Sequence, residues 1–576
     1  MKRVLIGHRG VGKTSLLWRH LDYFPKVKHF DLDHEIEKST GILVSEYFEK
    51  FGEINFRKKE LEMLYKIVDE NSDFVISLGA GFDSAALPEE IDVIFVSRVT
   101  DADGRIFLDR PRLKLELTPV EESQLLFKAR ERNYIMASNL IYHMPEGLET
   151  VNEIENIILS EAFEVKDAYY TLKIQDLPRI TSLMRCYEKI ELRTDLLNSV
   201  GIQYLLNERP EQHWLVSVRT ENSPLFSNAK YVDVDYKYYF KGCQIVSSHA
   251  DEIAGGLKEL FEFNARPDIN EKVHLKLSPI IENFSDLIIG YNWQQQDAAN
   301  RSFLPRSKNG KWAWYRKLCK YNQKINFVRN HTDMADQPSL FEWLILPNIK
   351  PQKWAGIIGK PVHFSRSLTR HLNYFLQLQS FFTKIEIETE DFKKYFGFLT
   401  DLGLQYVAIT SPLKEAAFQI AVEPTKMAQQ LRAANSLYIK EKHIFCHNTD
   451  WGGFNELVEN IKSKDKIAVW GGGGTLAMIK NILPTAHYYS SQTGQLRDKD
   501  ILAFASYDYL IWAAPRTELA KWPPLNMQVI SVIDLNYTDD SMGLEFATQR
   551  KIKYVSGAKM FNAQALLQQE FWSSKN

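Results

Sequence analysis

The sequence predicts a multidomain α/β protein built on parallel sheets. Its 576 residues are enough for three or four domains of ordinary size. Short apolar runs alternate with helical patterns in residues 1–160 and again from Trp354 onward, which is typical of sheets whose strands are joined by helices. A glycine-rich loop follows an apolar run near each end of the chain, as in domains that bind phosphates between a strand and a helix. We therefore expect a nucleotide-binding domain at each end and a further domain between them.

The apolar runs and the residues that interrupt them indicate where the domains begin and end. In the first domain, strand-like runs at 4–6, 74–76 and 93–96 predict a parallel sheet with helices on both faces. The middle of the chain has only short strand-like runs, and Pro347 and Pro351 mark the linker that follows it. The predicted domains are residues 1–162, 163–350 and 351–576, the last with lobes at about 351–455 and 456–555 and a C-terminal helix at 557–576.

Composition and charge exclude several classes of protein. A hydrophobic content of 44% and a net charge of −2 are typical of a soluble globular protein without a broadly basic nucleic-acid-binding surface. The basic start, Met1-Lys2-Arg3, precedes too few apolar residues for a signal peptide, and no run is long enough to span a membrane. The four cysteines form no CxxC pair and are expected to be reduced thiols. We expect a cytoplasmic protein that binds small molecules rather than nucleic acid or membranes, and the sequence leaves a homodimer open.

The first glycine-rich loop is the most informative stretch of the chain. Residues 7–14 read Gly-His-Arg-Gly-Val-Gly-Lys-Thr, between a strand-like run and a helical pattern. Lys13 can reach the β- and γ-phosphates of a nucleotide, and the Thr14 hydroxyl can hold Mg²⁺. The glycines that let backbone N–H groups surround the phosphate oxygens are Gly7, Gly10 and Gly12. This pattern predicts that ATP and Mg²⁺ bind here.

Further features follow this loop and predict a second ligand beside the nucleotide. Asp31 and Asp33 form a pair of carboxylates at a strand end, one near Mg²⁺ and one near an acceptor hydroxyl. Arg57 offers a guanidinium that can bind a substrate carboxylate through two parallel hydrogen bonds. The remaining features are Gly79 and Gly81, which permit close approach of the backbone to a ligand, the Arg110-Pro111 pair in a charged segment that we expect to be a lid, and Arg130 on a later helix.

In this order, the features of the N-terminal domain resemble the shikimate kinase family. Ala80 in place of the middle glycine of the family's glycine triplet is a mild departure. The resemblance implies a P-loop kinase domain that transfers the γ-phosphoryl group of ATP to shikimate, a reaction governed by positioning and charge neutralisation. It implies these roles: Asp33 orients the acceptor hydroxyl, Asp31 and Thr14 hold Mg²⁺, Arg57 and Arg130 hold the substrate carboxylate beside Gly79 and Gly81, and Arg110 closes on the transferring phosphoryl group.

The C-terminal domain resembles shikimate dehydrogenase, on motifs that extend from residue 354 to residue 576. Residues 356–367 read Gly-Ile-Ile-Gly-Lys-Pro-Val-His-Phe-Ser-Arg-Ser, and 448–452 read Asn-Thr-Asp-Trp-Gly, both similar to motifs of that family. The resemblance implies a two-lobed α/β domain in which Lys414 and Asp450 form the catalytic pair, because a lysine beside a carboxylate can pass a proton to the oxygen of a reduced ketone. The implied substrate-binding residues are Ser365, Ser367, Thr410, Asn435, Tyr537 and Gln564.

The second glycine-rich loop lies in this domain, after a strand-like run and before a helical pattern. It predicts a Rossmann lobe whose loop binds a dinucleotide through Gly471, Gly473, Gly474 and Thr475. One strand later, the family has an Asn-Arg-Thr triplet whose arginine pairs with the 2′-phosphate of NADP. Here the triplet is Ser491, Gln492 and Thr493. Because glutamine provides hydrogen bonds but no charge, NADPH is the expected cofactor while the choice between NADP and NAD stays open.

The middle segment contains Glu191-Leu192-Arg193-Thr194-Asp195 and then Arg219, His249 and Lys276, a series that resembles the motifs of type I 3-dehydroquinate dehydratase. His249 and Lys276 are one strand–helix unit apart, as expected for adjacent strands of a (β/α)8-type barrel. The resemblance implies that Lys276 forms an imine with the ketone while His249 moves protons, which requires burial or a neighbouring cation to lower the pKa of the lysine. The implied substrate-binding residues are Glu191, Arg193, Arg219, Arg316 and Gln337. The stretch between Arg219 and His249 is short, so we expect a shortened barrel that lacks some of its helices.

The order of the three domains matches the last three modules of the fungal AROM polypeptide. It implies a trifunctional enzyme that dehydrates 3-dehydroquinate, reduces 3-dehydroshikimate and phosphorylates shikimate. Two alternatives stay open: a regulator of the repressor type derived from the same modules, and a bifunctional dehydrogenase and kinase with an inactive dehydratase domain. The enzyme interpretation is favoured by the presence of Lys13, Asp33, Arg57, His249, Lys276, Lys414 and Asp450, which a pure regulator would be free to lose. Oligomeric state and channelling of intermediates stay open.

Overall fold

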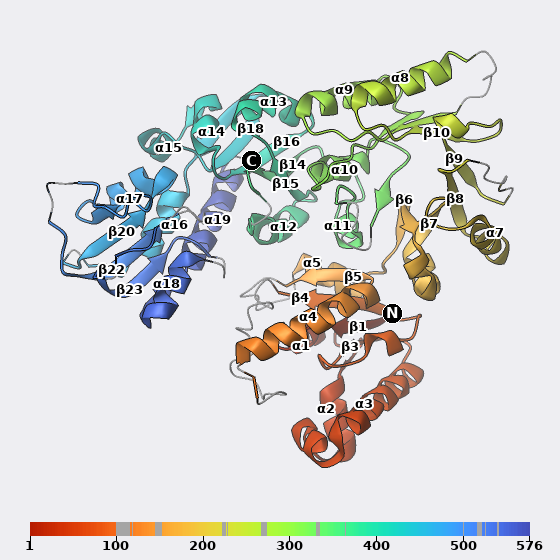
Figure 1. The fold of residues 1–576 in the computed structure, drawn as a ribbon, viewed down its shortest axis with the longest axis horizontal. Coiled ribbons are helices and arrows are strands. Elements are labelled where there is room, and N and C mark those ends of the chain that lie inside the picture. Colours follow the sequence, from red (N-terminus) through yellow and green to blue (C-terminus); the bar gives the residue numbers. More distant parts are fainter. Residues whose placement is uncertain are drawn as a thin grey trace. The chain divides into compact units, whose positions relative to one another are not determined.

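The computed structural model forms two compact units, Met1–Lys350 and Pro351–Asn576 (Figure 1). It describes residues 1–98, 116–117, 119–144, 152–221, 226, 228–266, 273–329, 335–362, 365–462, 464–498, 500, 502–514, 521–524, 526–537 and 541–575. Within these residues, no helix has the length and apolar character needed to cross a membrane. Each unit contains two sheets, and the predicted α/β architecture with parallel sheets is confirmed.

The first sheet of the N-terminal unit is parallel, with the strand order β2-β3-β1-β4-β5. Its strands are β1 (Lys2–Ile6), β2 (Lys28–Asp31), β3 (Phe74–Ser77), β4 (Asp92–Ser97) and β5 (Leu140–His143). The helices that accompany it are α1 (Lys13–Tyr23), α2 (Leu32–Thr40), α3 (Val44–Glu70), α4 (Pro119–Ala137) and α5 (Glu153–Ser160). The central strands are buried except at the first residues of β1 and β4, and α3 packs Leu64 and Val68 against them. The carboxyl end of β1 therefore opens directly into the glycine-rich loop and α1, as the sequence predicts.

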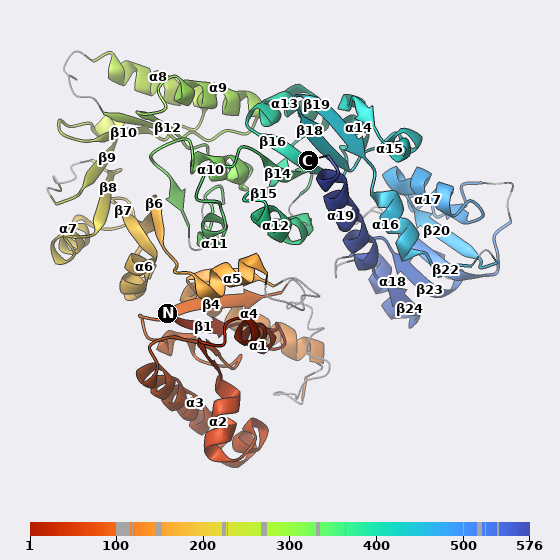
Figure 2. The same cartoon turned by 180° about the vertical axis from the view of Figure 1, so that it is seen from behind.

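The second sheet of this unit has eight parallel strands; the first seven follow one another in chain order (Figure 2), and the last pairs with the outer edge of the first. They are β6 (Val165–Leu172), β7 (Tyr187–Arg193), β8 (His213–Val218), β9 (Tyr231–Asp235), β10 (Ile245–Ser248), β11 (His274–Leu277), β12 (Arg301–Phe303) and β13 (Phe327–Val328). The helices between them are α6 (Ile180–Cys186), α7 (Ser199–Glu208), α8 (Ile253–Asn264), α9 (Phe284–Gln295) and α10 (Ala313–Cys319), and α11 (Leu340–Leu344) follows the last strand. This order is that of a (β/α)8-type barrel, but among the described residues β12 and β13 do not pair with each other, so the sheet is open between them.

The barrel is shortened around β9, as the short spacing from Arg219 to His249 predicts. Among the residues that the structure describes, no helix connects β8 to β9, and only the single turn η5 (Tyr236–Tyr238) connects β9 to β10. The strands themselves are kept in register, since β9 pairs with β8 on one side and with β10 on the other. The shortening therefore removes outer helices and keeps the strand ends that face the interior.

The C-terminal unit contains two lobes. The first has a six-stranded mixed sheet of β14 (Trp354–Gly359), β15 (Phe382–Glu386), β16 (Leu404–Ile409), β17 (Glu423–Pro424), β18 (Ser436–Lys440) and β19 (His443–His447), with α12 (Ser367–Gln377), α13 (Thr389–Asp401), α14 (Lys414–Ile420) and α15 (Lys426–Leu431). The second has a five-stranded parallel sheet of β20 (Ile467–Gly471), β21 (His487–Tyr489), β22 (Ser506–Ala513), β23 (Gln528–Asp534) and β24 (Lys553–Val555), with α17 (Leu476–Ile482) and α18 (Met542–Arg550).

Two helices join the lobes of this unit. α16 (Asp450–Leu457) leads from the first lobe into the second, and α19 (Ala558–Ser573), the predicted C-terminal helix, packs along it (Figure 1). Near the end of α19, Gln568 bonds to His371 of the first lobe and Trp572 Nε1 donates to Leu437 O. The C-terminal helix therefore packs against the first lobe, which carries most of the predicted substrate-binding residues.

Candidate active sites

The glycine-rich loop after β1 is shaped for close approach of a ligand to its backbone. Gly12 has a φ of +97°, and a Cβ atom there would lie 2.8 Å from Met144 Sδ. A Cβ atom at Gly7 would lie 2.2 Å from Val96 O, closer than any side chain could tolerate. Lys13 is buried, and its Nζ donates to the carbonyl oxygens of Gly7 and His8 at 2.9 and 3.0 Å. The ammonium group thus lies over the loop, where phosphates would meet it.

Thr14 and Asp31, the predicted metal ligands, are in direct contact. Thr14 Oγ1 donates to Asp31 Oδ2 at 2.7 Å, and Asp31 in turn caps the start of α2. A hydroxyl and a carboxylate beside a phosphate site are the oxygen donors that Mg²⁺ prefers. These two residues therefore fit a magnesium ion by their chemistry.

The buried Glu60, the half-buried Asp33 and Arg57 together form one wall of the site, beside Gly79 and Gly81. Burial, with Asp31 nearby, raises the pKa of Asp33 to about 6, and burial raises the pKa of Glu60 to about 7. Arg57 Nη1 donates to Glu60 Oε2 at 2.5 Å. A Cβ atom at Gly79 would lie 2.9 Å from Glu60 Oε1, and one at Gly81 would lie 2.0 Å from Arg57 Nη2. Because the two glycines have no side chains, they leave the space that these charged side chains occupy.

The departure at Ala80 has a simple structural reason. The site uses the carbonyl oxygen of Ala80, which accepts hydrogen bonds from Arg130 Nη1 at 2.9 Å and from the Tyr134 hydroxyl. A methyl group on this residue does not interfere with that carbonyl, so alanine is tolerated where Gly79 and Gly81 are required. Arg130 thus lies at the same wall as Arg57, while Arg110 and the predicted lid lie outside the described residues.

His8 is a residue of this site that the sequence analysis missed. Its ring stacks on Phe127 of α4, with centroids 4.5 Å apart, and meets Tyr134 edge-on at 5.0 Å. Burial lowers its pKa to about 4, so the ring is neutral at physiological pH. His8 therefore joins the phosphate loop to α4, the helix that carries Arg130. An aromatic ring inside a glycine-rich loop was the feature that could have revealed it.

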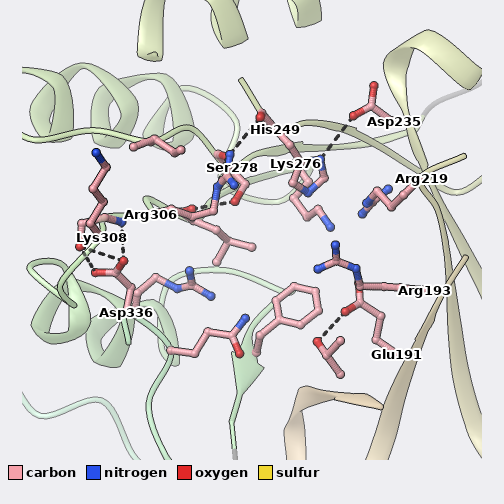
Figure 3. A pocket seen from close by; sticks show the side chains of 17 residues that line it. Glu191, Arg193, Arg219, Asp235, His249, Lys276, Ser278, Arg306, Lys308 and Asp336 are labelled. Atoms are coloured by element: carbon pink, nitrogen blue, oxygen red, sulfur yellow. Dashed lines mark hydrogen bonds and ion pairs between the residues drawn. The ribbon is translucent and has the colours of Figure 1, made fainter. Parts of the chain in front are cut away.

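In the middle domain, the structure brings all seven predicted residues to one cavity of about 430 Å³ at the carboxyl ends of the strands (Figure 3). They are Glu191, Arg193, Arg219, His249, Lys276, Arg316 and Gln337. Lysine and arginine side chains outnumber carboxylates on its walls, which favours an anionic ligand. Arg316 is almost fully buried, and its Nη1 lies 3.5 Å from Pro305 O, which leaves its hydrogen-bonding capacity to a ligand.

Lys276 is the most deeply buried cation of this cavity. Only 3% of its side chain is exposed, and burial lowers its pKa although Asp233 opposes that effect. Asp233 lies on β9, one strand beyond the β10 that neighbours β11, and it also accepts from Arg219 Nη2 at 2.6 Å. Burial disfavours the ionised form of Asp233, but Arg219 and Lys276 outweigh it and hold its pKa well below its usual range. The structure therefore adds a carboxylate to the site that the motifs did not contain.

His249 has a carboxylate neighbour as well. Its Nδ1 lies 3.5 Å from Asp235 Oδ2, a contact drawn in Figure 3. Burial, reinforced by Arg219, lowers the pKa of His249 to about 3, so its imidazole is neutral and can accept a proton. Asp233 and Asp235 alternate on β9 and therefore point to the same face of the strand. Two carboxylates separated by one residue in an apolar strand were the pattern that could have revealed both.

In the C-terminal unit, the predicted catalytic pair is formed. Lys414 Nζ lies 2.6 Å from Asp450 Oδ2, and the other oxygen, Oδ1, accepts from Asn435 Nδ2 at 2.9 Å. The Ser365 and Ser367 hydroxyls lie 3.1 Å apart at the start of α12. The lysine therefore has one fixed position, because its partner carboxylate is held from both sides.

The remaining predicted substrate residues lie around this pair. Thr410 follows β16, four residues before Lys414, and packs so closely on Gly359 that a Cβ atom there would lie 2.3 Å from its methyl group. Gln564 of α19 packs against Gly453, one turn after Asp450. The Tyr537 ring has the Arg366 guanidinium 5.5 Å from its centre, which places it beside the segment of the two serines.

The dinucleotide loop after β20 has backbone geometry that favours glycine. Gly471 has a φ of +91°, and a Cβ atom there would lie 2.7 Å from Ala514 Cα. Thr475 Oγ1 donates to Gly472 O at 2.7 Å. The loop thus leaves its backbone free for a close approach by a pyrophosphate.

The segment after β21 contains the triplet that lacks the family's arginine, but another arginine, Arg497, lies close to the dinucleotide loop. Ser491 is buried, whereas Gln492 and Thr493 are exposed on a tight turn. This turn brings Arg497 back beside β21, where its N–H donates to Tyr488 O and its Nη2 lies 3.3 Å from Gly471 O. A guanidinium therefore lies a few residues after the triplet, at the edge of the dinucleotide loop.

Comparison with known proteins finds a different family at each end of the chain. Residues 9–158 match the family model described as shikimate kinase. The shikimate kinase of Aquifex aeolicus is 34% identical over 168 residues, which cover 27% of this chain and 94% of that protein.

At the other end, residues 357–437 match the model described as the shikimate dehydrogenase substrate binding domain. The shikimate dehydrogenase (NADP(+)) of Clostridium beijerinckii is 26% identical over 247 residues, which cover 38% of this chain and 90% of that protein. The crystal structure of shikimate dehydrogenase 1 from Peptoclostridium difficile is similar with a TM-score of 0.33 and 23% identity, over 38% of this chain and 92% of that one.

Proposed function

Because the chain belongs to the shikimate kinase family through residues 9–158 and has a shikimate dehydrogenase domain at its other end, we propose that it is a trifunctional enzyme of three consecutive steps. It removes water from 3-dehydroquinate, reduces the resulting 3-dehydroshikimate to shikimate, and phosphorylates shikimate. The observation that carries the proposal is the middle cavity, where all seven predicted residues meet around a buried lysine.

In the kinase domain, the chain's own residues position the two substrates. ATP, with Mg²⁺, supplies the phosphoryl group. Lys13 neutralises phosphate charge above the loop, and Thr14 with Asp31 would hold the metal ion. Asp33 accepts a hydrogen bond from the shikimate hydroxyl in its ionised form, and its raised pKa of about 6 places it close to the operating range of a base. Arg57 and Arg130 bind the carboxylate of shikimate.

In the dehydrogenase domain, Lys414 and Asp450 move the proton. NADPH supplies the hydride. Lys414 donates its proton to the ketone oxygen as negative charge develops there, and Asp450 keeps the lysine oriented by the 2.6 Å contact. The hydroxyls of Ser365 and Ser367 bind the substrate carboxylate. Arg497 provides positive charge for the 2′-phosphate, which favours NADP over NAD.

In the middle domain, the geometry supports an elimination through an imine. Lys276 is buried and held against β9, and His249 is neutral and adjacent to the same cavity. The Nζ of Lys276 attacks the ketone of 3-dehydroquinate, and His249 removes the proton from the adjacent carbon and returns it to the departing hydroxyl. Arg316, buried without a charged partner in contact among the described residues, binds the carboxylate of the substrate.

One observation favours a second candidate, the bifunctional enzyme with an inactive middle domain. The connections of β9 contain no α-helix among the described residues, so this part of the barrel has less outer support than the rest. The regulator alternative is less favoured, because the charged pairs at Lys414 and Lys276 are both formed.

The test is a reconstitution in which every intermediate is followed by mass spectrometry. The purified chain is incubated with 3-dehydroquinate, ATP, Mg²⁺ and NADPH, beside the variants Lys276→Met, Lys414→Met and Lys13→Met. The wild type should produce shikimate 3-phosphate, and the three variants should stop at 3-dehydroquinate, 3-dehydroshikimate and shikimate, respectively. If wild-type protein leaves 3-dehydroquinate untouched but converts 3-dehydroshikimate to the phosphate, the bifunctional candidate is correct. No turnover of any substrate would favour the regulator.

A further inference from the structure

Strand β9 supplies the middle cavity with a carboxylate whose contacts are unlike those of any other acid there. Asp233 is completely buried, yet it is ionised, because one of its oxygens, Oδ2, meets both Lys276 Nζ and Arg219 Nη2. Ser217 Oγ lies 3.4 Å from the same oxygen. A single carboxylate oxygen thus faces the reacting lysine and a guanidinium together.

The other oxygen of Asp233 has no partner. Oδ1 is buried and accepts no hydrogen bond from the residues that the structure describes. A buried acceptor without a donor is costly, so a carboxylate with one free oxygen is poised to accept a donor that arrives with a ligand. Because Lys276 Nζ lies at the neighbouring oxygen Oδ2, a nitrogen or hydroxyl group of an intermediate formed at Nζ is within reach of Oδ1.

The surroundings of Lys276 make a counter-charge necessary. Its ammonium group also lies 5.2 Å from the centre of the Phe327 ring, and only 3% of the side chain is exposed. An isolated positive charge in such a place is strongly disfavoured unless it is paired. The titratable and charged groups that face this position are Tyr169 on β6, Glu191 and Arg193 on β7, Arg219 after β8, Asp235 on β9, His249 after β10, His274 on β11 and Arg316 on α10. Of the acids among the described lining groups, Asp233 is the one that contacts Nζ.

We propose that Asp233 is the counter-ion of the imine formed at Lys276, and that it keeps the imine nitrogen protonated throughout the elimination; this rests on the proposed dehydration. The charge is conserved in each step. Lys276 begins as an ammonium group; one of its protons moves to the ketone oxygen, the freed electron pair of Nζ forms a bond to the carbonyl carbon, and the carbon–oxygen bond then breaks. Two of the three protons of the lysine leave with that oxygen as water, and one stays on the nitrogen, so Asp233 faces one positive charge before and after.

The protonated imine is what the next step requires. When His249 removes the proton from the adjacent carbon, the electron pair moves into the imine and neutralises its nitrogen. The pair then expels the hydroxyl group, which takes the proton from His249 and leaves as water, and the nitrogen is positive again. Water finally hydrolyses the imine and restores the ammonium group of Lys276. Asp233 stabilises each charged form and so favours the electron-accepting state of the nitrogen.

The test uses the full chain and the substitution Asp233→Asn, which keeps the shape and removes the charge. Cyanoborohydride reduces the protonated imine, so the amount of Lys276 adduct with 3-dehydroquinate can be measured by mass spectrometry as a function of pH. In the wild type, the adduct should stay constant from neutral to mildly alkaline pH. In Asp233→Asn it should fall as the pH rises, and the optimum of dehydration should move to lower pH by about one unit or more, because the imine loses its proton more easily.

The controls separate this role from a structural one. Asp233→Glu keeps the charge and should restore a flat adduct profile, whereas a packing defect would lower the adduct equally at every pH. Asp251→Asn, which removes an exposed carboxylate, should leave the profile of the wild type. An Asp233→Asn profile identical to that of the wild type would overturn the proposal alone. A wild-type adduct that declines at mildly alkaline pH would overturn it even if the variants fail to fold. Absence of any wild-type adduct would overturn the dehydration and this inference together.

Discussion

Replacing Gly81 with alanine should displace the arginine that we assign to the carboxylate of shikimate. A Cβ atom at this position would lie 2.0 Å from Arg57 Nη2, whereas ordinary contacts begin at 3.4 Å, so the guanidinium would have to retreat by about 1.4 Å (3.4 − 2.0). The end of the side chain is flexible and can move, but its 2.5 Å bond to Glu60 Oε2 would then be lost. Since the φ of Gly81 is not in the left-handed region, the effect comes from this contact alone.

The expected magnitude follows from the hydrogen bond to the shikimate carboxylate that the displaced Arg57 can no longer make. A hydrogen bond to a charged group contributes about 1.5–3 kcal/mol, so the KM for shikimate should rise roughly 10- to 100-fold. The phosphate loop is untouched, and the KM for ATP should change by no more than about twofold. Both constants are measured from ADP release with one substrate varied at saturation of the other.

A matched control lies one residue away. Ala80→Gly leaves the carbonyl that binds Arg130 and Tyr134 in place, so it should change the KM for shikimate by no more than about twofold. If Gly81→Ala changes the KM for ATP as much as that for shikimate, the variant has distorted the whole site. If it changes neither, Arg57 does not bind the substrate carboxylate and the assignment is wrong.

Three other outcomes are expected. Because the pKa of Asp33 is raised to about 6, kinase turnover should increase as the pH rises through that value. Asp33 and Glu60, whose pKa is raised to about 7, bind protons more tightly in the folded state, so the stability that they contribute is complete below about pH 4 and lost by about pH 7. The melting temperature of the ligand-free kinase domain within the full chain should therefore fall over this range, and a flat profile would contradict the assignment. Asp450→Asn should lower the turnover of 3-dehydroshikimate reduction by about 100-fold or more while shikimate phosphorylation by the same sample stays unchanged, and equal losses would indicate misfolding instead. Arg497→Gln should weaken binding of 2′,5′-ADP by about tenfold, measured by calorimetry, without affecting 5′-AMP; an equal loss for both would place Arg497 outside the 2′-phosphate site.

Much of the fold could be predicted from the sequence because its signals are local. The phosphate loop at residues 7–14 is a strand, a turn and a helix in immediate succession, so its glycines, lysine and threonine need no distant partner to be recognised. The spacing from Arg219 to His249 predicted that helices would be missing from the barrel, and no helix occurs there among the described residues. The prediction that Arg110 belongs to a lid is untested, because that segment lies outside the described residues.

Other features could not be predicted because they depend on which strands become neighbours. Ala80 seemed to be a departure from a pattern, and only its hydrogen bonds with Arg130 and Tyr134 show that the carbonyl is the group in use. Arg497 was missed because its position depends on the tight turn after β21, which returns it to Gly471.

The sequence by itself determined that the chain has two phosphate-binding loops, where its kinase and dehydrogenase domains lie, and which lysines are candidates for catalysis, because each of these is written in a short run of residues. The tertiary structure decided which acid faces each of these lysines. Asp450 meets Lys414, and Asp233 reaches Lys276 because β9 lies one strand away from β11, with β10 between them. A charge acts on its neighbours in space, and in a barrel those neighbours come from strands that are far apart in the chain.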